Sequence, residues 1–287
     1  MMPKYRLKGH GGFFMRDGWF AKGLTEVKEN PRVFTKEFFF GADALGVGSA
    51  MAKAVKYWLL VSGLTYEVRG KGTMLTSMGE MICQNDLYLE DIFSIWLLHI
   101  HIVSDEERAT FWYLFFHEIG LGEFTKEQMQ EKLKKALLRY SEEEAISERS
   151  FSDDCNILLQ MYGDAQGGQE DPEDKKWSVF SRLGLIQKTY RGFKRERVSI
   201  DKLPQEIVLI VLMRVITDKG ESVENLLTCQ RGPGKLLSLD RILLSEYLDI
   251  LENEGYVRIN RTAGLDMVYL TESLPSEEEI ICDYYER

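Results

Sequence analysis

The stretch GVGSAMAKAVKYWLLVSGLTYEVRGKGTMLT, residues 46–76, decides the fold of the first part of the chain. A glycine-rich turn leads into an apolar segment that ends before Gly63, and two short β-forming runs follow on either side of RGKG at 69–72. Apolar side chains at helical spacing predict a helix with one buried face. These residues are Met51, Val55, Trp58 and Leu59. Turn, helix and hairpin in this order are typical of a winged helix-turn-helix, whose helix after the turn enters the DNA major groove.

Two more helices are predicted before this stretch, over residues 17–30 and 35–46. Pro31 ends the first because proline cannot continue a helix, and Thr35 is expected to cap the second. Residues 1–86 contain 12 Lys and Arg against 8 Asp and Glu, in a chain whose formal net charge is −10. We therefore predict that residues 1–86 form an N-terminal winged helix-turn-helix that binds double-stranded DNA.

The side chains expected to contact DNA lie on the outer face of the predicted third helix and at the tip of the hairpin. They are Ser49, Lys53, Lys56, Tyr57, Arg69 and Lys71. Surface lysines are usually just solvated, and a winged helix also serves as a protein-docking module. A protein-binding surface is therefore the alternative for this block.

The segment GHGGFFMRDGWFAKG, residues 9–23, combines glycines with aromatic side chains near the start of the chain. Its glycines do not precede a helix in a βαβ unit, so a phosphate-binding glycine loop is not supported. The aromatic side chains are expected to seal the base of the first block. His10 and Arg16 lie at its entry, where we expect a surface contact with a phosphate or a partner.

Three further parts follow. Residues 87–162 predict a central helical bundle, residues 163–203 combine an acidic loop with a basic edge segment, and residues 204–287 repeat the order of helices and a hairpin. The last part is therefore predicted to be a second winged-helix-like module, and the fold class is mainly α with small β wings. The outer face of its long helix is acidic and would be repelled by phosphates, which favours a protein partner there. The acidic residues are Asp240, Glu246, Asp249 and Glu252.

The most basic run is KTYRGFKRERVSI, residues 188–200. Its cations form a secondary basic patch: Lys188, Arg191, Lys194, Arg195 and Arg197. Cations that alternate with Tyr190 and Phe193 suit phosphate contacts combined with base stacking. The favoured interpretation is a solvated edge strand whose charges prevent aggregation.

Catalytic residues, a metal site and a cofactor site are not predicted. His99 and His101 lack the i, i+4 spacing of a helical metal pair and are expected in the core or at a helix end. Paired carboxylates in SDDC at 152–155 and NDLYLED at 85–91 are what a nuclease metal site would need. Helix caps and turns explain these acids equally well.

Other phosphate and membrane signals are also weak. QRGPGKLL, residues 230–237, lacks the first glycine and the hydroxyl residue of a P-loop and predicts a loop. The four cysteines form no C-x-x-C pair, which argues against a structural zinc site. No apolar run reaches the length of a membrane span, and the N-terminus lacks the apolar region of a signal peptide. We therefore expect a cytoplasmic protein.

Five stretches, in this order, resemble domain-of-unknown-function family 4007: GHGGFFMRDGWFAKGL, ALGVGSAMAKAVKYWL, LTSMGEMI, DLYLEDIFSIWLLH and TAGLDMVYL. The resemblance spans nearly the whole chain. Genes of this bacterial and archaeal family tend to lie beside genes for DNA phosphorothioation and phage defence, including phosphoadenosine-phosphosulfate-reductase-like enzymes, cysteine desulfurases and helicases. The resemblance implies a part in a DNA modification or restriction complex and transfers no catalytic residue.

Four functions are compatible with these observations. The first is a non-enzymatic DNA-binding adaptor of a phosphorothioation system, with a reductase-like or other modification enzyme as its protein partner. The alternatives are an assembly subunit without DNA affinity and a transcriptional regulator of the defence operon. A nuclease that uses Asp153 and Asp154 is the least favoured, and self-association into a homo-oligomer stays open.

Overall fold

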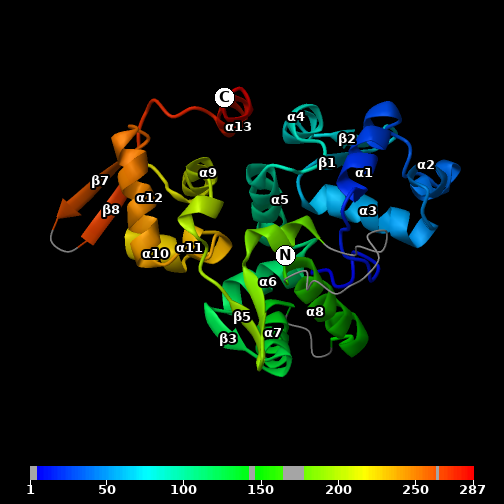
Figure 1. Ribbon diagram of the computed structural model, residues 1–287, viewed down its shortest axis with the longest axis horizontal. Coiled ribbons are helices and arrows are strands. Elements are labelled where there is room, and N and C mark those ends of the chain that lie inside the picture. Colours follow the sequence, from blue (N-terminus) through cyan, green and yellow to red (C-terminus); the bar gives the residue numbers. More distant parts are fainter. Residues whose placement is uncertain (1–4, 142–145, 164–177, 263–264) are drawn as a thin grey trace. The chain divides into compact units, whose positions relative to one another are not determined.

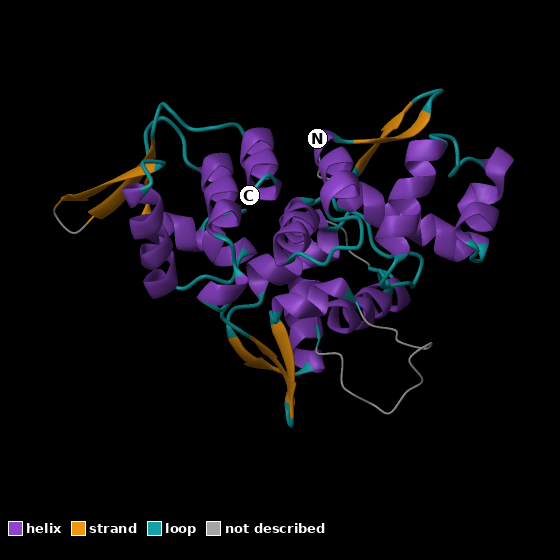
Figure 2. Ribbon diagram, turned by 45° about the horizontal axis from the view of Figure 1, so that its top comes forward, coloured by secondary structure: helices purple, strands orange, loops and turns teal. Residues whose placement is uncertain are grey.

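Figure 1 shows the computed structural model, which describes residues 5–141, 146–163, 178–262 and 265–287. Backbone contacts divide the chain into two units that meet between Glu196 and Arg197, and each unit is described by itself. Helices predominate, and the described strands pair into small antiparallel sheets (Figure 2). The prediction of a mainly α fold with small β elements is confirmed.

The first unit begins with short helices and a hairpin. The elements are α1 (Trp19–Glu29), the 3₁₀ helix η1 (Lys36–Gly41), α2 (Ala42–Leu45), α3 (Ser49–Val61), β1 (Thr65–Val68), β2 (Gly72–Leu75) and α4 (Ser77–Asn85). The helix and hairpin predicted from residues 46–76 are therefore confirmed. α3 follows Gly48 in extended conformation, and β1 pairs with β2 so that Val68 lies opposite Gly72.

The helix predicted over residues 35–46 is wrong in its detail. The backbone leaves the helical region at Phe38 and becomes left-handed at Phe39 and Phe40, where φ is 48° and 59°. Thr35 makes no side-chain capping hydrogen bond. Left-handed backbone is rare for bulky residues, so a run of phenylalanines gives no warning of such a break.

A glycine fixes the hairpin of β1 and β2 against the end of α1. The Thr73 N–H donates to the Pro31 carbonyl over 2.8 Å. At Gly72 the backbone φ is 108°, and an added Cβ would lie 2.1 Å from the same carbonyl oxygen. A side chain would meet both a steric clash and a strained backbone, so position 72 requires glycine.

The rest of the first unit combines a helical core with a three-stranded sheet. Its elements are α5 (Ile92–Ser104), α6 (Thr110–Glu118), β3 (Gly122–Phe124), α7 (Lys126–Ser141), α8 (Glu148–Tyr162), the 3₁₀ helix η3 (Val179–Leu183), β4 (Ile186–Thr189) and β5 (Gly192–Arg195). The sheet order is β3-β5-β4. The expectation of an all-helical region over 87–162 is thus wrong at β3, which pairs with a strand from the predicted segment 163–203. Most of the predicted acidic loop, residues 164–177, lies outside the described residues.

The core of the first unit lies on α5 and α6. Both helices are apolar on nearly every face, which is typical of a helix surrounded by protein. Their largest side chains are fully buried: Phe93, Trp96, Phe111, Trp112, Phe115 and Phe116.

The second unit repeats the alternation of helices and strands. Its elements are the 3₁₀ helix η4 (Ile200–Lys202), α9 (Gln205–Val215), β6 (Glu221–Ser222), α10 (Val223–Thr228), α11 (Pro233–Leu236), α12 (Arg241–Asn253), β7 (Val257–Thr262), β8 (Leu265–Leu270) and α13 (Glu277–Tyr285). The predicted hairpin is confirmed as β7 paired with β8. The loop predicted over 230–237 contains a short helix, because Pro233 is favourable in the first turn of a helix.

One element order occurs in both units. A helix, a short strand, two helical segments and a hairpin follow one another from α6 to β5 and again from α9 to β8. The 3₁₀ helix η3 precedes the hairpin in the first case, and the short α11 is inserted in the second. In both sheets the first strand pairs with the last, giving the orders β3-β5-β4 and β6-β8-β7. The region from α1 to β2 also places helices before a hairpin. Its sheet has two strands, and the Pro31 carbonyl accepts the hydrogen bond from Thr73 that a third strand would otherwise accept.

Within the described residues, no single helix is both long and apolar enough to cross a membrane. Only the two helical segments 36–45 and 49–61, taken together across an 89° bend, pass on length and composition.

Candidate nucleic-acid interface

The outer surface of α3 and the turn of the β1–β2 hairpin carry exposed cations. Ser49 and Lys53 are exposed on the first turns of α3, and Arg69 and Lys71 are exposed at the turn between β1 and β2. None of these three cations has an acidic partner among the described residues. α3 also has no acidic residue in its first turn. The exposed side chains therefore present uncompensated positive charge, which is the electrostatic requirement for binding phosphates.

Lys56 differs from Lys53. Its Nζ lies 2.9 Å from Glu67 Oε2, and Glu67 Oε1 accepts a hydrogen bond from Thr73 Oγ1 at 2.5 Å. The Lys56 charge is thus neutralised by an acid of β1. This side chain connects α3 with the hairpin, and a DNA contact would have to break an existing ion pair.

Tyr57 lies in the core, which corrects the expectation that it reaches DNA. The side chain is 5% exposed, and its hydroxyl donates to the Arg108 carbonyl over 2.9 Å. Burial, followed in size by the nearby Asp154 carboxylate, raises the pKa of Tyr57 well above its ordinary value. Tyr57 directly follows Lys56, but the rotation of about 100° between successive helical residues turns its side chain into the core.

His10 is also buried, which corrects its expected surface position. Its Nε2 lies 2.6 Å from Asp154 Oδ1 on α8, and its Nδ1 accepts a hydrogen bond from the Gly12 N–H. Nε2 therefore carries the proton and donates to the carboxylate. The imidazole stacks on Trp58 at 5.8 Å between ring centroids and meets Trp112 edge-on at 5.4 Å.

Asp154 holds the N-terminal segment against α8. Besides the His10 contact, both of its carboxylate oxygens accept from the Lys8 N–H at 3.0 Å. Burial is the main influence on Asp154 and raises the pKa of its carboxyl, in opposition to these hydrogen bonds. The neighbouring Asp153 binds the Lys8 ammonium at 2.5 Å, and this hydrogen bond lowers the pKa of Asp153.

The paired acids singled out in the sequence thus have structural partners. Asp153 and Asp154 bind Lys8 and His10, while Asp86 accepts from two backbone N–H groups and Asp91 caps α5. The described residues contain no group of three or more His, Cys, Asp or Glu side chains arranged to hold a metal ion. Capping and turn roles, one of the two interpretations of these acids, account for the contacts of Asp86 and Asp91.

Arg16 is partly buried against aromatic side chains. Its guanidinium is 5.5 Å from the Trp19 ring centroid and 6.0 Å from that of Phe14, and its Nε has no hydrogen-bond partner among the described residues. The aromatic residues of 9–23 therefore pack into the first unit, as expected. His99 is fully buried beside Tyr162, whose hydroxyl is 2.8 Å from His99 Nδ1.

The secondary basic patch predicted on β4 and β5 is not a continuous cationic surface. Lys188 and Arg191 are exposed, but Lys194 pairs with Glu196 at 2.7 Å. Arg195 is buried, which corrects its assignment to a surface patch. Its guanidinium donates to the carbonyl of Phe116 over 2.9 Å and to that of Ile119, at the end of α6.

Arg197, at the start of the second unit, pairs with Asp240 at 2.7 Å. Asp240 also caps α12, because its Oδ1 accepts from the Leu243 N–H. The acidic face predicted on α12 is therefore partly neutralised within its own unit. Arg261 on β7 contacts both Asp249 and Glu252, at 2.5 and 3.1 Å.

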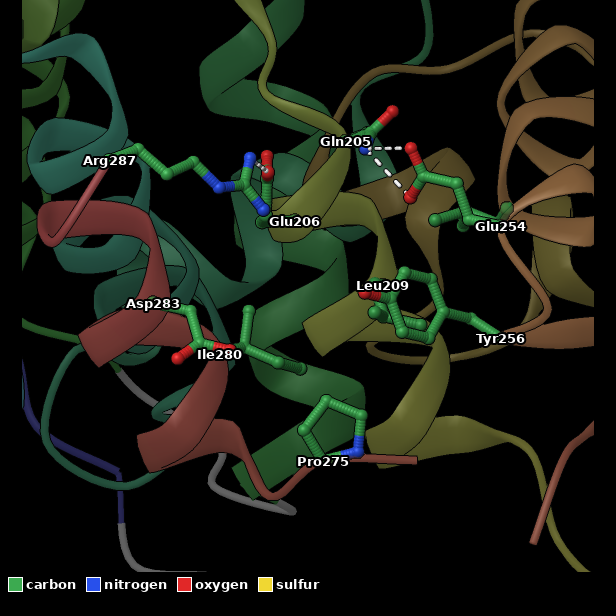
Figure 3. Close-up of a pocket in the computed structure, with 10 residues that line it drawn as sticks. Gln205, Glu206, Leu209, Glu254, Tyr256, Pro275, Ile280, Asp283 and Arg287 are labelled. Carbon is green, nitrogen blue, oxygen red and sulfur yellow. Dashed lines mark hydrogen bonds and ion pairs between the residues drawn. The ribbon is translucent and has the colours of Figure 1, made fainter. Parts of the chain in front are cut away.

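A shallow pocket also lies in the second unit, between α9, α12 and α13 (Figure 3). Figure 3 shows Gln205 directed at Glu254 and Arg287 directed at Glu206. The Gln205 amide donates to both carboxylate oxygens of Glu254 at 2.8 and 2.9 Å, and Arg287 lies 2.6 Å from Glu206. These two contacts connect α9 with the residues that follow α12 and α13.

Comparison with known proteins supplies the family. No curated protein matches the chain. Two solved structures share the fold: a magnesium ion-bound SspB crystal structure, with a TM-score of 0.79 and 22% identity over 98% of this chain and 93% of that one, and an SspB crystal structure, with a TM-score of 0.80 and 21% identity over 98% and 88%. A family model described as a protein of unknown function matches residues 7–285. The chain therefore belongs to the DUF4007 family.

Proposed function

We propose that this protein is a non-enzymatic DNA-binding adaptor of a DNA phosphorothioation or related phage-defence system. The observation that carries the proposal is the set of exposed cations on α3 and the β1–β2 turn, Lys53, Arg69 and Lys71, which lack acidic partners among the described residues. Cations from a helix and from a hairpin that follow each other along the chain match the way in which a winged helix holds a duplex.

The shared element order supports this interpretation. We infer that α1–β2, α6–β5 and α9–β8 are three winged-helix modules, of which the first lacks its first strand. A winged helix is expected to present its third helix and its hairpin to DNA. In these modules the third helices are α3, α8 and α12.

Charge then distinguishes the three modules. On α8, the carboxylates of Asp153 and Asp154 are bound by the N-terminal segment. On α12, the acids would repel phosphate, and they hold the Arg261 guanidinium of the wing. α3 has exposed cations and no acid in its first turn, so the first module is the one suited to a polyanion.

The second unit is proposed to bind a protein partner. Its acidic α12 also exposes Ile242, which is 67% accessible, and an apolar side chain among acids suits a protein surface better than a phosphate backbone. A phosphoadenosine-phosphosulfate-reductase-like or other modification enzyme is the proposed partner. Co-purification with that enzyme tests this part separately: a variant at the exposed Ile242 of α12 should retain less of the enzyme than the wild type.

The DNA-binding proposal is tested by fluorescence anisotropy with a labelled duplex, titrated with salt. In the test variant, Lys53→Glu is combined with Lys71→Glu. In the control variant, Lys132→Glu on α7 is combined with Lys219→Glu in the second unit, so that the net charge changes equally and both lysines are also exposed.

Wild-type affinity is expected to fall steeply between about 50 and about 200 mM salt as counterions are displaced. The test variant should bind at least tenfold more weakly, and the slope of log K against log salt should decrease by roughly one per lost phosphate contact. The control should bind like the wild type. Equal losses of DNA affinity in both variants, or no DNA binding by the wild type, would contradict the proposal. The remaining function would then be that of an assembly subunit without DNA affinity. Tight binding to one promoter sequence only would favour the transcriptional regulator.

A second candidate function is Mg²⁺-dependent DNA cleavage, because one of the structures with this fold is a magnesium ion-bound SspB. The acidic side chains of the described residues form no group that could coordinate a metal ion. Asp153 and Asp154 are already bound by Lys8 and His10. We therefore derive no step through a metal. Incubation of supercoiled plasmid with and without Mg²⁺ separates the two functions: metal-dependent nicking by the wild type would replace the adaptor proposal.

A further inference from the structure

The segment between α1 and α3 presents phenylalanine rings to solvent. Phe38 is 40% exposed and Phe39 is 67% exposed, although most large apolar side chains of the first unit are buried. The next ring, Phe40, is half-buried, and the Lys53 ammonium lies 4.1 Å from its centroid. This contact places the aromatic segment beside the first turns of α3, at the proposed DNA-binding surface.

The backbone holds this presentation rigidly. Phe39 and Phe40 are left-handed, and Gly41 follows with φ 85°. The N–H groups of Phe38 and Phe40 both donate to the Thr35 carbonyl, at 3.1 and 2.9 Å. Two left-handed aromatic residues in succession are costly, so the surrounding structure determines this conformation. In this conformation the Phe39 ring lies outside the core.

Buried anchors lie on both sides of the exposed rings. Val33 and Phe34 before them are 2% and 3% exposed, and Leu45 after them is 2% exposed. The Phe34 ring packs within 3.0–3.2 Å of where a Cβ on Gly41 would lie. The exposed rings are therefore displayed from a fixed base.

The charges around the rings favour a nucleic acid. Lys36 is exposed at the start of the same segment, and Lys53 lies against Phe40. The acid of the segment, Glu37, is paired with Arg32 at 2.5 Å; Asp43 is exposed on α2. Aromatic faces beside ammonium groups bind unpaired nucleotides, because bases stack on the rings while phosphates contact the cations.

We propose that Phe38 and Phe39 stack on unpaired nucleobases, so that the substrate class of the first unit is DNA with an exposed single strand. This inference rests on the proposed DNA-binding function and specifies the state of the DNA that is bound. An intact duplex hides its base faces, so it would engage the cations of α3 and the wing but not the rings. Single-stranded or locally opened DNA would engage both.

The test compares Phe39→Gly with the wild type. Glycine suits the left-handed backbone, so this variant removes the ring and keeps the local conformation. Tyr88→Ala is the control, because Tyr88 is also an exposed aromatic residue of the first unit, at 69%. Phe39→Trp is the conservative variant and should retain stacking. The probes are a single-stranded oligonucleotide of about 12 nucleotides with a central 2-aminopurine, and a blunt duplex of the same sequence.

We expect Phe39→Gly to bind the single strand roughly tenfold more weakly, as expected for loss of one stacked base, and to bind the duplex within about twofold of the wild type. The change in 2-aminopurine fluorescence on binding should be lost in Phe39→Gly and present in Phe39→Trp and Tyr88→Ala. A merely structural role would not alter the probe fluorescence selectively.

The outcomes separate this inference from the proposed function. If Lys53→Glu with Lys71→Glu weakens binding but Phe39→Gly leaves single-strand affinity and fluorescence unchanged, the stacking inference is wrong and DNA binding stands. If the wild type binds neither probe, both are wrong. If Phe39→Gly instead abolishes sedimentation with vesicles of phosphatidylcholine and phosphatidylglycerol, and no probe fluorescence changes, the rings contact lipid and the inference is overturned.

Discussion

Replacing His10 by alanine should uncouple the N-terminal segment from the first unit. The substitution removes a fully buried ring that lies between Trp58 and Trp112, and it leaves the Asp154 carboxylate with only the Lys8 N–H as a donor. Loss of a hydrogen bond to a charged group costs about 1.5–3 kcal/mol, and the cavity that the ring leaves adds to this cost. We therefore expect the free energy of unfolding of the first unit to fall by about 4 kcal/mol.

The matched variant Asp154→Asn should cost less. The asparagine oxygen can still accept from His10 Nε2 and from the Lys8 N–H, as Oδ1 does. The amide nitrogen replaces Oδ2 opposite the Lys8 N–H, so that N–H loses one of its two acceptors at a cost of about 1–2 kcal/mol. In a double-mutant cycle, His10→Ala and Asp154→Ala should couple by about 2 kcal/mol, because the second change removes the buried charge that the first leaves unpaired.

Urea unfolding followed by tryptophan fluorescence is a suitable assay, because every tryptophan of the sequence precedes Arg197 and the signal reports only on the first unit. The positions are Trp19, Trp58, Trp96, Trp112 and Trp177. A loss below about 1 kcal/mol in His10→Ala, or additive single effects, would refute the assignment of the pair as a buried anchor.

The pH dependence gives an independent measurement. Burial raises the pKa of Asp154 above its ordinary value of 3.8, so the folded state binds this proton more tightly than the unfolded state. The protonated Asp154 therefore adds to the free energy of unfolding at pH values below 3.8, its ordinary pKa. This contribution is lost as the pH rises through the raised pKa of the folded state. In His10→Ala, which lacks the stabilising donor, the unfolding free energy should decline more steeply with rising pH above about 4 than in the wild type; parallel profiles would contradict this.

Two further predictions concern single positions. Gly72→Ala should lower the free energy of unfolding by at least about 2 kcal/mol, because its Cβ would overlap the Pro31 carbonyl oxygen at a backbone φ of 108°; a melting temperature equal to that of the wild type would show that the hairpin can shift. Asp240→Ala should destabilise the second unit by about 1 kcal/mol through loss of the cap on the Leu243 N–H and of the Arg197 pair. The cap and pair lower the pKa of Asp240, so this contribution is present above its ordinary value of 3.8 and lost as the pH falls through the lowered pKa; a variant effect that persists in strong acid would contradict it.

Local sequence patterns were sufficient to predict helices, and strands that pair with a neighbour close in the chain. The helix at 49–61 and the hairpin after it were predictable because their apolar spacing and turn glycines lie within one short stretch. β3 was missed because three residues are too few to show an alternating pattern, and its partner β5 lies far along the chain.

Side-chain roles were less predictable than elements. His10 and Asp154 are 144 residues apart, and no local pattern connects them, so a buried anchor resembled a surface histidine. The exposed position of Phe39 depends on left-handed backbone that apolar composition does not indicate. By contrast, the cations at 53, 69 and 71 were placed correctly on the surface. Lys53 lies opposite the apolar stripe of a helix, and Arg69 and Lys71 lie in a hairpin turn, and both places face solvent.

The His10–Asp154 contact also sets an order of events during synthesis. The N-terminal segment leaves the ribosome first, but the aspartate that receives it is made 144 residues later. At bacterial and eukaryotic elongation rates, this interval lasts roughly 7–30 s. Until then, His10 and the α3 side chains that it packs against, Tyr57 and Trp58, lack the carboxylate that fixes the histidine in place. The N-terminal segment of the nascent chain is therefore unanchored until α8 emerges, and chaperones or premature association would act on it in this interval.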